Sequence, residues 1–396
     1  MPTLEPKGLI SLSEPVISGN EWCYIKDCLD TGWVSTVGTY VTRFEEVIAN
    51  YVGTKHAVAT VNGTSALHVS LIASSVQPDD EVIVPALTFI APVNVIRYCN
   101  AYPVFMDSDA DTLCMDVQKF IDFIRNECEQ RSNGYTYNKE TNRRLKAVIP
   151  VHVFGYPTEM DMLLEVCEEN NIDIIEDATE SLGSEYKRKK TGSFGKAGCF
   201  SFNGNKIITA GGGGMIVTDD EVLVNKMRHL TTQAKKDPFE YDHDEIGYNY
   251  RLNNIQAAMG VAQMEKIEEF VQIKRENAKL YIELLASIKG LEFLEEAEWV
   301  KSNYWLFTIK IPKEHKNPLI KHLLSKSIQV RPIWKLISFL PMYSGFQSYK
   351  IDRADGVYES CISLPSSVNL KQSEIEYIAN EIVGYFKRLY RRTRSN

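Results

Sequence analysis

Five short apolar segments recur through the first half of the chain and alternate with stretches that favour helices. They lie at residues 56–61, 81–85, 103–107, 147–155 and 173–178. Because they are apolar along most of their length, and not only at alternate positions, they predict strands that are buried on both faces. Buried strands that alternate with helices are typical of a mostly parallel sheet with helices on both sides. The alternation therefore predicts an α/β fold.

The chain has 396 residues, which is enough for two domains. We expect a polar N-terminal arm at residues 1–22, a large domain at 23–265 and a smaller domain at 266–396. One long helix from residue 255 to about 287 is expected to lead into the smaller domain. The polar residues 129–146 predict an inserted surface loop or hairpin.

Charge and cysteine content argue against several classes of protein. The net charge of −8 disfavours a general nucleic-acid binder. No apolar run approaches the roughly 20 residues of a membrane span, and the first residues lack the apolar core of a secretory signal, so we expect a cytosolic protein. The eight cysteines form no Cys-x-x-Cys pair, and the seven histidines show no metal-binding spacing. We therefore expect reduced thiols, no metal site and no membrane partner.

Lys206 lies in a glycine-rich segment between two β-like runs. Asn203-Gly204-Asn205 precedes it, and four consecutive glycines follow at residues 211–214. Glycine frees the backbone to bend and lets another group approach closely. A lysine in this setting can anchor an aldehyde cofactor covalently, whereas the alternative is an ordinary solvated lysine.

A second candidate site follows the first apolar segment, where Gly63, Thr64 and Ser65 begin a helix. Backbone N–H groups, hydroxyls and the positive end of the helix dipole would meet there, which favours an anion. The alternative is a plain helix cap formed by Thr64 or Ser65. The chain has neither a P-loop nor a G-x-G-x-x-G motif, which counts against a dinucleotide-binding oxidoreductase.

Phe89, His152 and Asp177 are also expected to lie at or just past the ends of strands. Ligands of parallel sheets bind beyond the carboxyl ends of the strands, so these side chains can converge. The alternatives are a helix cap for Asp177 and a hydrogen-bonded core residue for His152. Pyridoxal 5′-phosphate needs a lysine, an acid facing its ring nitrogen, a phosphate cradle and a flat group against its ring. Lys206, Asp177, the turn beginning at Gly63 and Phe89 match these needs.

With these motifs the chain resembles the DegT-type nucleotide-sugar aminotransferases, which belong to the fold-type I pyridoxal phosphate enzymes. The resemblance covers nearly the whole chain and rests on residues 32–35, 62–67, 85–91, 152–155, 175–178, 192–195, 200–214, 247–251 and 364–365. It implies a large domain with a mostly parallel sheet of the seven-stranded type, flanked by helices, and a smaller α+β C-terminal domain.

The resemblance also implies roles for individual residues. Lys206 would bind the cofactor aldehyde, Asp177 would pair with the ring nitrogen, and both would be catalytic. Asn249 would reach the phosphate in the neighbouring subunit, which implies a homodimer with composite sites. Glu180 stands where the family commonly has Gln or His, near the phenolic oxygen. The implied cofactor-binding set is Gly63, Thr64, Ser65, Phe89, Asp177, Glu180, Ser201, Asn203, Lys206 and Asn249.

The activity that the resemblance implies is transamination of a nucleotide-linked 4-keto-6-deoxy sugar by L-glutamate, in surface-polysaccharide biosynthesis. Residues 334–338 replace the family's Trp-x-Pro-Leu-His pattern. Together with residues 203–205 and 129–146, they are similar to the branch that aminates UDP-4-keto-6-deoxy-N-acetylhexosamines. The alternatives are a GDP-4-keto-6-deoxymannose aminotransferase of the perosamine type and a non-catalytic regulatory protein that binds pyridoxal phosphate. Lys206 disfavours the related sugar dehydratases, in which a histidine replaces the lysine.

Overall fold

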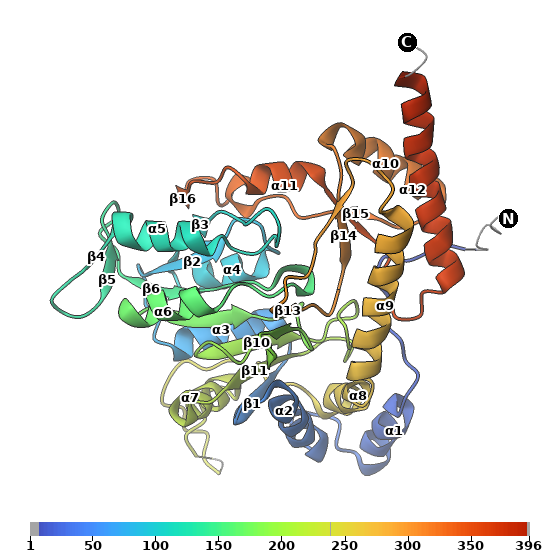
Figure 1. The fold of residues 1–396 in the computed structure, drawn as a ribbon. Helices are drawn as coiled ribbons and strands as arrows, with labels where there is room; N and C mark the ends of the chain where they lie inside the picture. Colours follow the sequence, from blue (N-terminus) through green and yellow to red (C-terminus); the bar gives the residue numbers. More distant parts are fainter. Residues whose placement is uncertain (1–7, 238, 394–396) are drawn as a thin grey trace.

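A computed structural model describes residues 8–237 and 239–393 of the chain (Figure 1). Its largest sheet has eight strands, in the order β1-β11-β10-β7-β6-β2-β3-β16. Every pair from β10 to β16 is parallel, and β11 runs antiparallel to both of its neighbours. The strands are β1 (His56–Thr60), β2 (Glu81–Pro85), β3 (Tyr102–Met106), β6 (Leu145–Val148), β7 (Asp173–Asp177), β10 (Ala197–Ser201), β11 (Gly214–Thr218) and β16 (Ser348–Tyr349).

The five apolar segments form β1, β2, β3, β6 and β7, which confirms the predicted mostly parallel sheet. The expected sheet of the seven-stranded type is present and has one additional strand at its edge. Ser348 and Tyr349, from the C-terminal part of the chain, pair with Phe105 and Met106 and add β16 at the sheet edge. A strand of two residues that forms by pairing with a distant partner has no periodic pattern of its own, so the sequence did not indicate it.

Helices cover both faces of this sheet. In β2, Val82 and Val84 pack in the core on the side of α3, α4 and α7, whereas Ile83 packs with α5 and α6 on the other side. On the same face as α5 and α6, the helices α2 and α8 cover the part of the sheet that β1, β10 and β11 form. These helices are α2 (Thr39–Val52), α3 (Gly63–Ala73), α4 (Ala91–Tyr98), α5 (Val117–Glu127), α6 (Asp161–Glu169), α7 (Glu221–Thr231) and α8 (Asn254–Met264).

The C-terminal part of the chain forms a second, antiparallel sheet in the order β12-β14-β17-β15. Three helices pack on it and share its core, with Tyr281, Leu323 and Ile378 fully buried between them. The elements are α9 (Ile267–Leu285), β12 (Glu292–Phe293), β14 (Phe307–Lys310), α10 (Lys313–Ser325), β15 (Arg331–Pro332), β17 (Cys361–Leu364) and α12 (Gln372–Thr393). This arrangement agrees with the expected α+β unit, while the domain limits at residues 23–265 and 266–396 stay predictions.

The long helix expected from residue 255 to 287 is interrupted, and α8 and α9 meet at Glu265 and Lys266. The Lys266 N–H donates to the Gln263 carbonyl at 3.0 Å, which tightens the last turn of α8. The Glu265 carboxylate accepts hydrogen bonds from Asn20 and Tyr24. Contacts with the N-terminal region therefore accompany the break, and no glycine or proline in the sequence marked it.

Shorter elements complete the fold: α1 (Glu21–Thr31), β4 (Cys128–Gln130), β5 (Thr136–Asn138), η1 (Val153–Gly155), β8 (Glu185–Tyr186), β9 (Lys189–Lys190), β13 (Val300–Lys301), η2 (Ile337–Phe339) and α11 (Ala354–Ser360). The β4–β5 pair confirms a hairpin within the polar insertion. Residues 1–7 of the expected arm lie outside the described residues, and from residue 8 the arm runs to α1, with Ile10 paired to Ile328.

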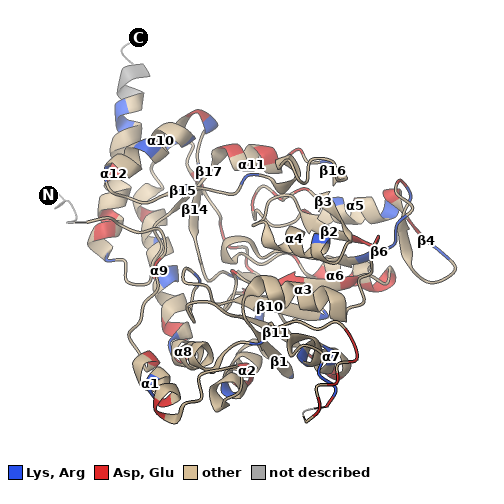
Figure 2. Ribbon diagram, turned by 180° about the vertical axis from the view of Figure 1, so that it is seen from behind, with Lys and Arg blue, Asp and Glu red and all other residues tan. Residues whose placement is uncertain are grey.

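The structure shows how the charges and the cysteines are distributed. Basic and acidic residues are mixed over the outer helices (Figure 2). All eight cysteines are free thiols, and only Cys23 is exposed. Among the described residues, no helix is both long enough and apolar enough to span a membrane.

Candidate active site

A pocket of about 420 Å³ opens beyond the carboxyl ends of β1, β2, β7 and β10. It brings together eight of the ten residues that the sequence singled out for the cofactor. These are Gly63, Thr64, Phe89, Asp177, Glu180, Ser201, Asn203 and Lys206. Ser65 and Asn249 do not line this pocket. The convergence of segments that are up to 143 residues apart is what the parallel topology predicts.

Lys206 follows β10 in a short turn, in which its N–H donates to the Asn203 carbonyl at 3.0 Å. Its Nζ lies 3.5 Å from Glu180 Oε1 and 4.0 Å from the centre of the Trp305 ring. The side chain is 12% exposed, so the amine faces the pocket and not bulk solvent. The reading of Lys206 as an ordinary solvated lysine is therefore wrong.

The glycines after Lys206 bring β11 close to the start of α3. A side chain at Gly214 would put its Cβ 2.5 Å from the backbone carbon of Asn62, which no real Cβ tolerates. Gly213 has φ +110°, a conformation that favours glycine. These two residues thus let a strand pass beside the turn that begins α3.

Asp177 ends β7 and is almost fully buried in the pocket wall. Its Oδ1 accepts the Thr179 N–H at 3.1 Å. Burial raises the pKa of this carboxyl, while the hydrogen bonds from Thr179 and the charge of Lys206 oppose the rise. No helix begins at Asp177, so the helix-cap alternative is wrong.

Glu180 is buried between Lys206 and η1. Its Oε2 accepts the Phe154 N–H at 2.9 Å, and its backbone carbonyl accepts a hydrogen bond from Asn303. Burial raises the pKa of the Glu180 carboxyl to about 7, although the nearby Lys206 amine acts in the opposite direction. The carboxyl beside the lysine therefore changes its charge near neutral pH.

The N-terminus of α3 supplies the backbone donors of the site. Asn62 caps the helix, because its Oδ1 accepts the Ser65 N–H at 2.7 Å, so the alternative of Thr64 or Ser65 as the cap is wrong. Gly63 and Thr64 are the first two helical residues and line the pocket, and their N–H groups have no acceptor within the helix. The Ser65 N–H already donates to Asn62 Oδ1, so it is not available to a ligand.

His152 belongs to the core and not to the pocket. Its Nδ1 accepts the Thr158 N–H at 3.0 Å, and its Nε2 lies 3.0 Å from Glu176 Oε2. Since Nδ1 is an acceptor, Nε2 carries the proton, and this N–H donates a hydrogen bond to the Glu176 carboxylate. The core-residue alternative for His152 is confirmed.

The further residues that line the pocket include Thr88, Trp305 and Trp334, to which the sequence assigned no role in the site. The Trp334 ring lies 6.4 Å from the half-exposed Phe89 ring, so the two form an aromatic wall. The Thr88 hydroxyl is buried and has no hydrogen-bond partner among the described residues. Thr88 could have been found from its place beside Phe89, whereas nothing in the sequence connects Trp305 with Lys206.

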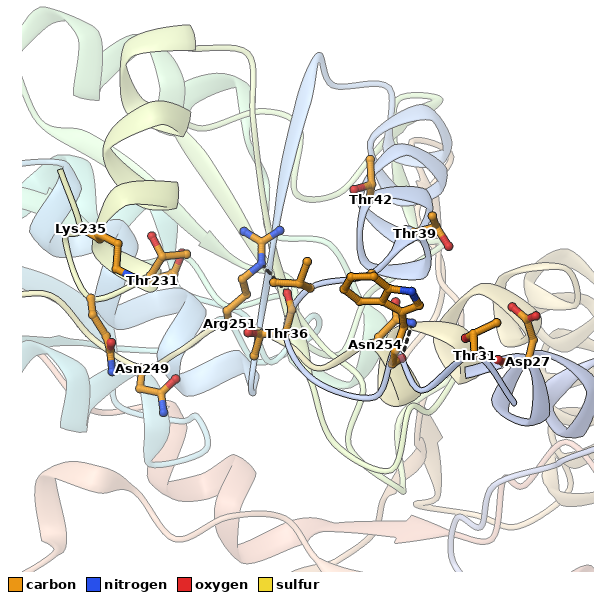
Figure 3. A pocket seen from close by; sticks show the side chains of 15 residues that line it. Asp27, Thr31, Thr36, Thr39, Thr42, Thr231, Lys235, Asn249, Arg251 and Asn254 are labelled. Atoms are coloured by element: carbon orange, nitrogen blue, oxygen red, sulfur yellow. Dashed lines mark hydrogen bonds between the residues drawn. The ribbon is translucent and has the colours of Figure 1, made fainter. Parts of the chain in front are cut away.

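Asn249 lies in a different cavity, of about 1000 Å³, at the surface near α1, α2 and α8 (Figure 3). Arg251 and the loop that carries Trp33 and Thr36 also line it, and the Arg251 Nε donates to the Thr36 carbonyl at 3.1 Å. Trp33 is 58% exposed there. Within one chain, Asn249 is thus separate from the pocket of Lys206, and its role as a ligand of a neighbouring subunit stays a prediction.

Comparison with known proteins gives a consistent picture. The DegT/DnrJ/EryC1/StrS aminotransferase family matches residues 15–383. The GDP-perosamine synthase of Escherichia coli O157:H7 is 38% identical over 95% of this chain and 98% of its own length. That of Caulobacter vibrioides is 36% identical over 93% of this chain and 96% of its own.

Among solved structures, the PLP form of Spr1654 from Streptococcus pneumoniae, which is named provisionally as a sugar aminotransferase, superposes with a TM-score of 0.86. It is 26% identical and covers 96% of this chain and 99% of its own. The match extends across both sheets and supports the fold-type I assignment. The chain therefore belongs to the DegT/DnrJ/EryC1/StrS family and is a pyridoxal phosphate-dependent sugar aminotransferase.

Proposed function

We propose that the chain transfers the amino group of L-glutamate to C4 of GDP-4-keto-6-deoxymannose. The observation that carries this proposal is the identity of 38% and 36% with two GDP-perosamine synthases over more than nine-tenths of the chain. The sequence motifs favoured a UDP-linked N-acetylhexosamine instead, and the relatives support the GDP-linked alternative better. Both substrates present a ketone at C4, so the same chemistry serves either.

The pocket suits pyridoxal phosphate on the chemistry of its own residues. The buried Asp177 carboxylate needs a hydrogen-bond donor or cation beyond Thr179, which a protonated ring nitrogen provides. The N–H groups at the start of α3, which have no acceptor within the helix, suit a phosphate. Thr88, whose buried hydroxyl has no hydrogen-bond partner among the described residues, also lines this space. When bound, the cofactor supplies an aldehyde and a ring that stores electrons.

Each residue then has a proposed task. Lys206 would hold the cofactor through its aldehyde carbon, and Asp177 would keep a proton on the ring nitrogen. Gly63 and Thr64 bind the phosphate through their N–H groups, with Ser201 at the end of β10 beside them. Phe89 lines the same pocket and would lie against the cofactor ring.

Proton transfer at the reacting carbon is the task of the Lys206 amine once it is free. Glu180 lies 3.5 Å from that amine and can exchange a proton with it, because its pKa of about 7 permits both charge states. Trp305 and Trp334 close the apolar side of the pocket. A site that excludes water strengthens these electrostatic contacts.

The proposed active unit is a homodimer in which Asn249 completes the site of the other subunit. In support, Asn249 lies at the surface, in the large cavity beside the exposed Trp33. A cavity lined by exposed apolar and polar side chains is the kind of surface that a second copy can fill.

The test is a substrate panel. The enzyme is first converted by L-glutamate, then separated from it and mixed with GDP-, UDP- and dTDP-linked 4-keto-6-deoxy sugars. We expect the GDP-mannose derivative to restore the absorbance of the aldehyde form fastest. A faster return with a UDP-N-acetylhexosamine derivative would favour the reading from the sequence motifs. Failure of glutamate to convert the enzyme at all would favour a regulatory role.

A further inference from the structure

Lys274 in α9 is a buried amine outside the site described above. It is 3% exposed, and its Nζ donates hydrogen bonds to the carbonyls of Trp305, at 3.1 Å, and Ser366. Among the described residues no carboxylate pairs with it, and burial lowers the pKa of its amine to about 7. Burying a cation without a counter-charge is unfavourable, so its presence needs a reason beyond packing.

The two carbonyls lie beside the ends of two neighbouring strands of the smaller sheet. Trp305 lies just before β14, and Ser366 lies just after β17, which pairs with β14. The Ser366 hydroxyl donates to the Trp305 carbonyl at 3.1 Å. The Trp305 N–H donates to Asn303 Oδ1 at 2.8 Å, and the Asn303 amide donates to the Glu180 carbonyl. The backbone of Trp305 is therefore held on both sides.

The side chain of Trp305 reaches the turn of the catalytic lysine. Its Nε1–H donates to the Asn205 carbonyl at 2.6 Å. The face of its ring lies 4.0 Å from Lys206 Nζ. One indole thus contacts both the backbone that precedes Lys206 and the amine itself.

We infer that Trp305 is a further catalytic-site residue, which holds the Lys206 amine against its indole face, and that Lys274 is the positioning residue that fixes Trp305. The inference rests on the proposed role of Lys206. An ammonium over an indole face is attracted by the electron density of the ring. A small displacement of the ring would therefore move the amine relative to its reaction partner, and such displacements have large effects on rate.

The test compares Lys274→Met with Lys316→Met. Lys316 in α10 is a matched control, because it is 5% exposed, donates to a backbone carbonyl and has its pKa lowered by burial. Its partner Tyr358, unlike Trp305, does not line the pocket. The apoproteins are mixed with pyridoxal 5′-phosphate. Covalent attachment is followed by absorbance, and its position is found by borohydride reduction and mass spectrometry. Thermal unfolding of both variants is measured in parallel.

We expect Lys274→Met to slow attachment at Lys206 at least tenfold, and Lys316→Met to leave the rate within twofold at a similar change in stability. Equal effects of the two variants would overturn the inference. If Lys274→Met does not fold, the same measurement is made on Trp305→Phe and Trp305→Leu. The rate of attachment at Lys206 should be lower than wild type in Trp305→Phe, which keeps an aromatic ring, and lower still in Trp305→Leu. A Leu variant at the wild-type rate would also overturn it. If the wild-type protein attaches no cofactor at Lys206, the proposed function itself is wrong.

Discussion

Glu180 gives the sharpest quantitative prediction, because its carboxyl is buried and its charge depends on pH. Burial raises its pKa from 4.5 to about 7. Between these two values the folded protein keeps the proton, whereas the unfolded chain has lost it. Stability therefore falls as pH rises through this window, and the full loss is present above pH 7. A shift of this size corresponds to about 3 kcal/mol.

Glu180→Gln removes the titrating group but keeps the shape of the side chain. We expect the unfolding free energy of the variant, relative to wild type, to increase by up to about 3 kcal/mol between acidic and mildly alkaline pH. The assay is urea unfolding of the apoprotein at pH 5 and pH 8, since a bound cofactor would add its own stabilisation. A difference between variant and wild type that is the same at both pH values would refute the reasoning.

A control variant with the opposite sign is available at Glu185. Burial alone would raise the pKa of this carboxyl, but hydrogen bonds from Lys190 and Lys301 outweigh burial and lower it. Its contribution to stability is therefore present at neutral pH and is lost as pH falls through the lowered pKa. Glu185→Gln should destabilise the protein at pH 8 and matter less in acid.

Three further predictions concern the site and its surroundings. Asp177→Asn should still bind pyridoxal phosphate but lose at least roughly 10²-fold in turnover, because the amide cannot hold a proton on the ring nitrogen; wild-type turnover would remove Asp177 from its role. Lys206→Ala should be inactive and Asn249→Ala weakly active when each is assayed alone. If the sites are shared between subunits, a mixture of the two variants that is refolded together should regain activity. A mixture without activity would speak against shared sites. The free energy of unfolding of the wild type should rise between about pH 7 and pH 10, because a lysine in the unfolded chain still holds the proton that buried Lys274 has lost. Urea unfolding of Lys274→Met should not show this rise.

Local pattern was enough for the central sheet and for much of the pocket. Strands buried on both faces must be apolar throughout, so β1, β2, β3, β6 and β7 were visible without any partner in view. Parallel strands carry their ligands at their carboxyl ends, which is why Asp177, Phe89 and the start of α3 could be expected to meet. Lys206 was found because glycines surround it.

Other features depend on contacts between distant segments. The two-residue strand β16 forms because Tyr349 finds Met106, 243 positions away in the chain. The break between α8 and α9 coincides with contacts of Glu265 with Asn20 and Tyr24. Neither β16 nor the break between α8 and α9 has a periodic pattern or a turn residue in the sequence that would predict it.

The sequence by itself determined the class of fold, the cofactor chemistry and the lysine, because each depends on residue types at short spacing. Only the tertiary structure showed that His152 is a core residue, that Asn62 and not Thr64 caps α3, and that Asn249 lies apart from the pocket. It also showed that Trp305 lies against Lys206, with Lys274 behind it. The physical reason is that burial, and with it the charge of a group such as Glu180 or Lys274, is set by what packs around a side chain.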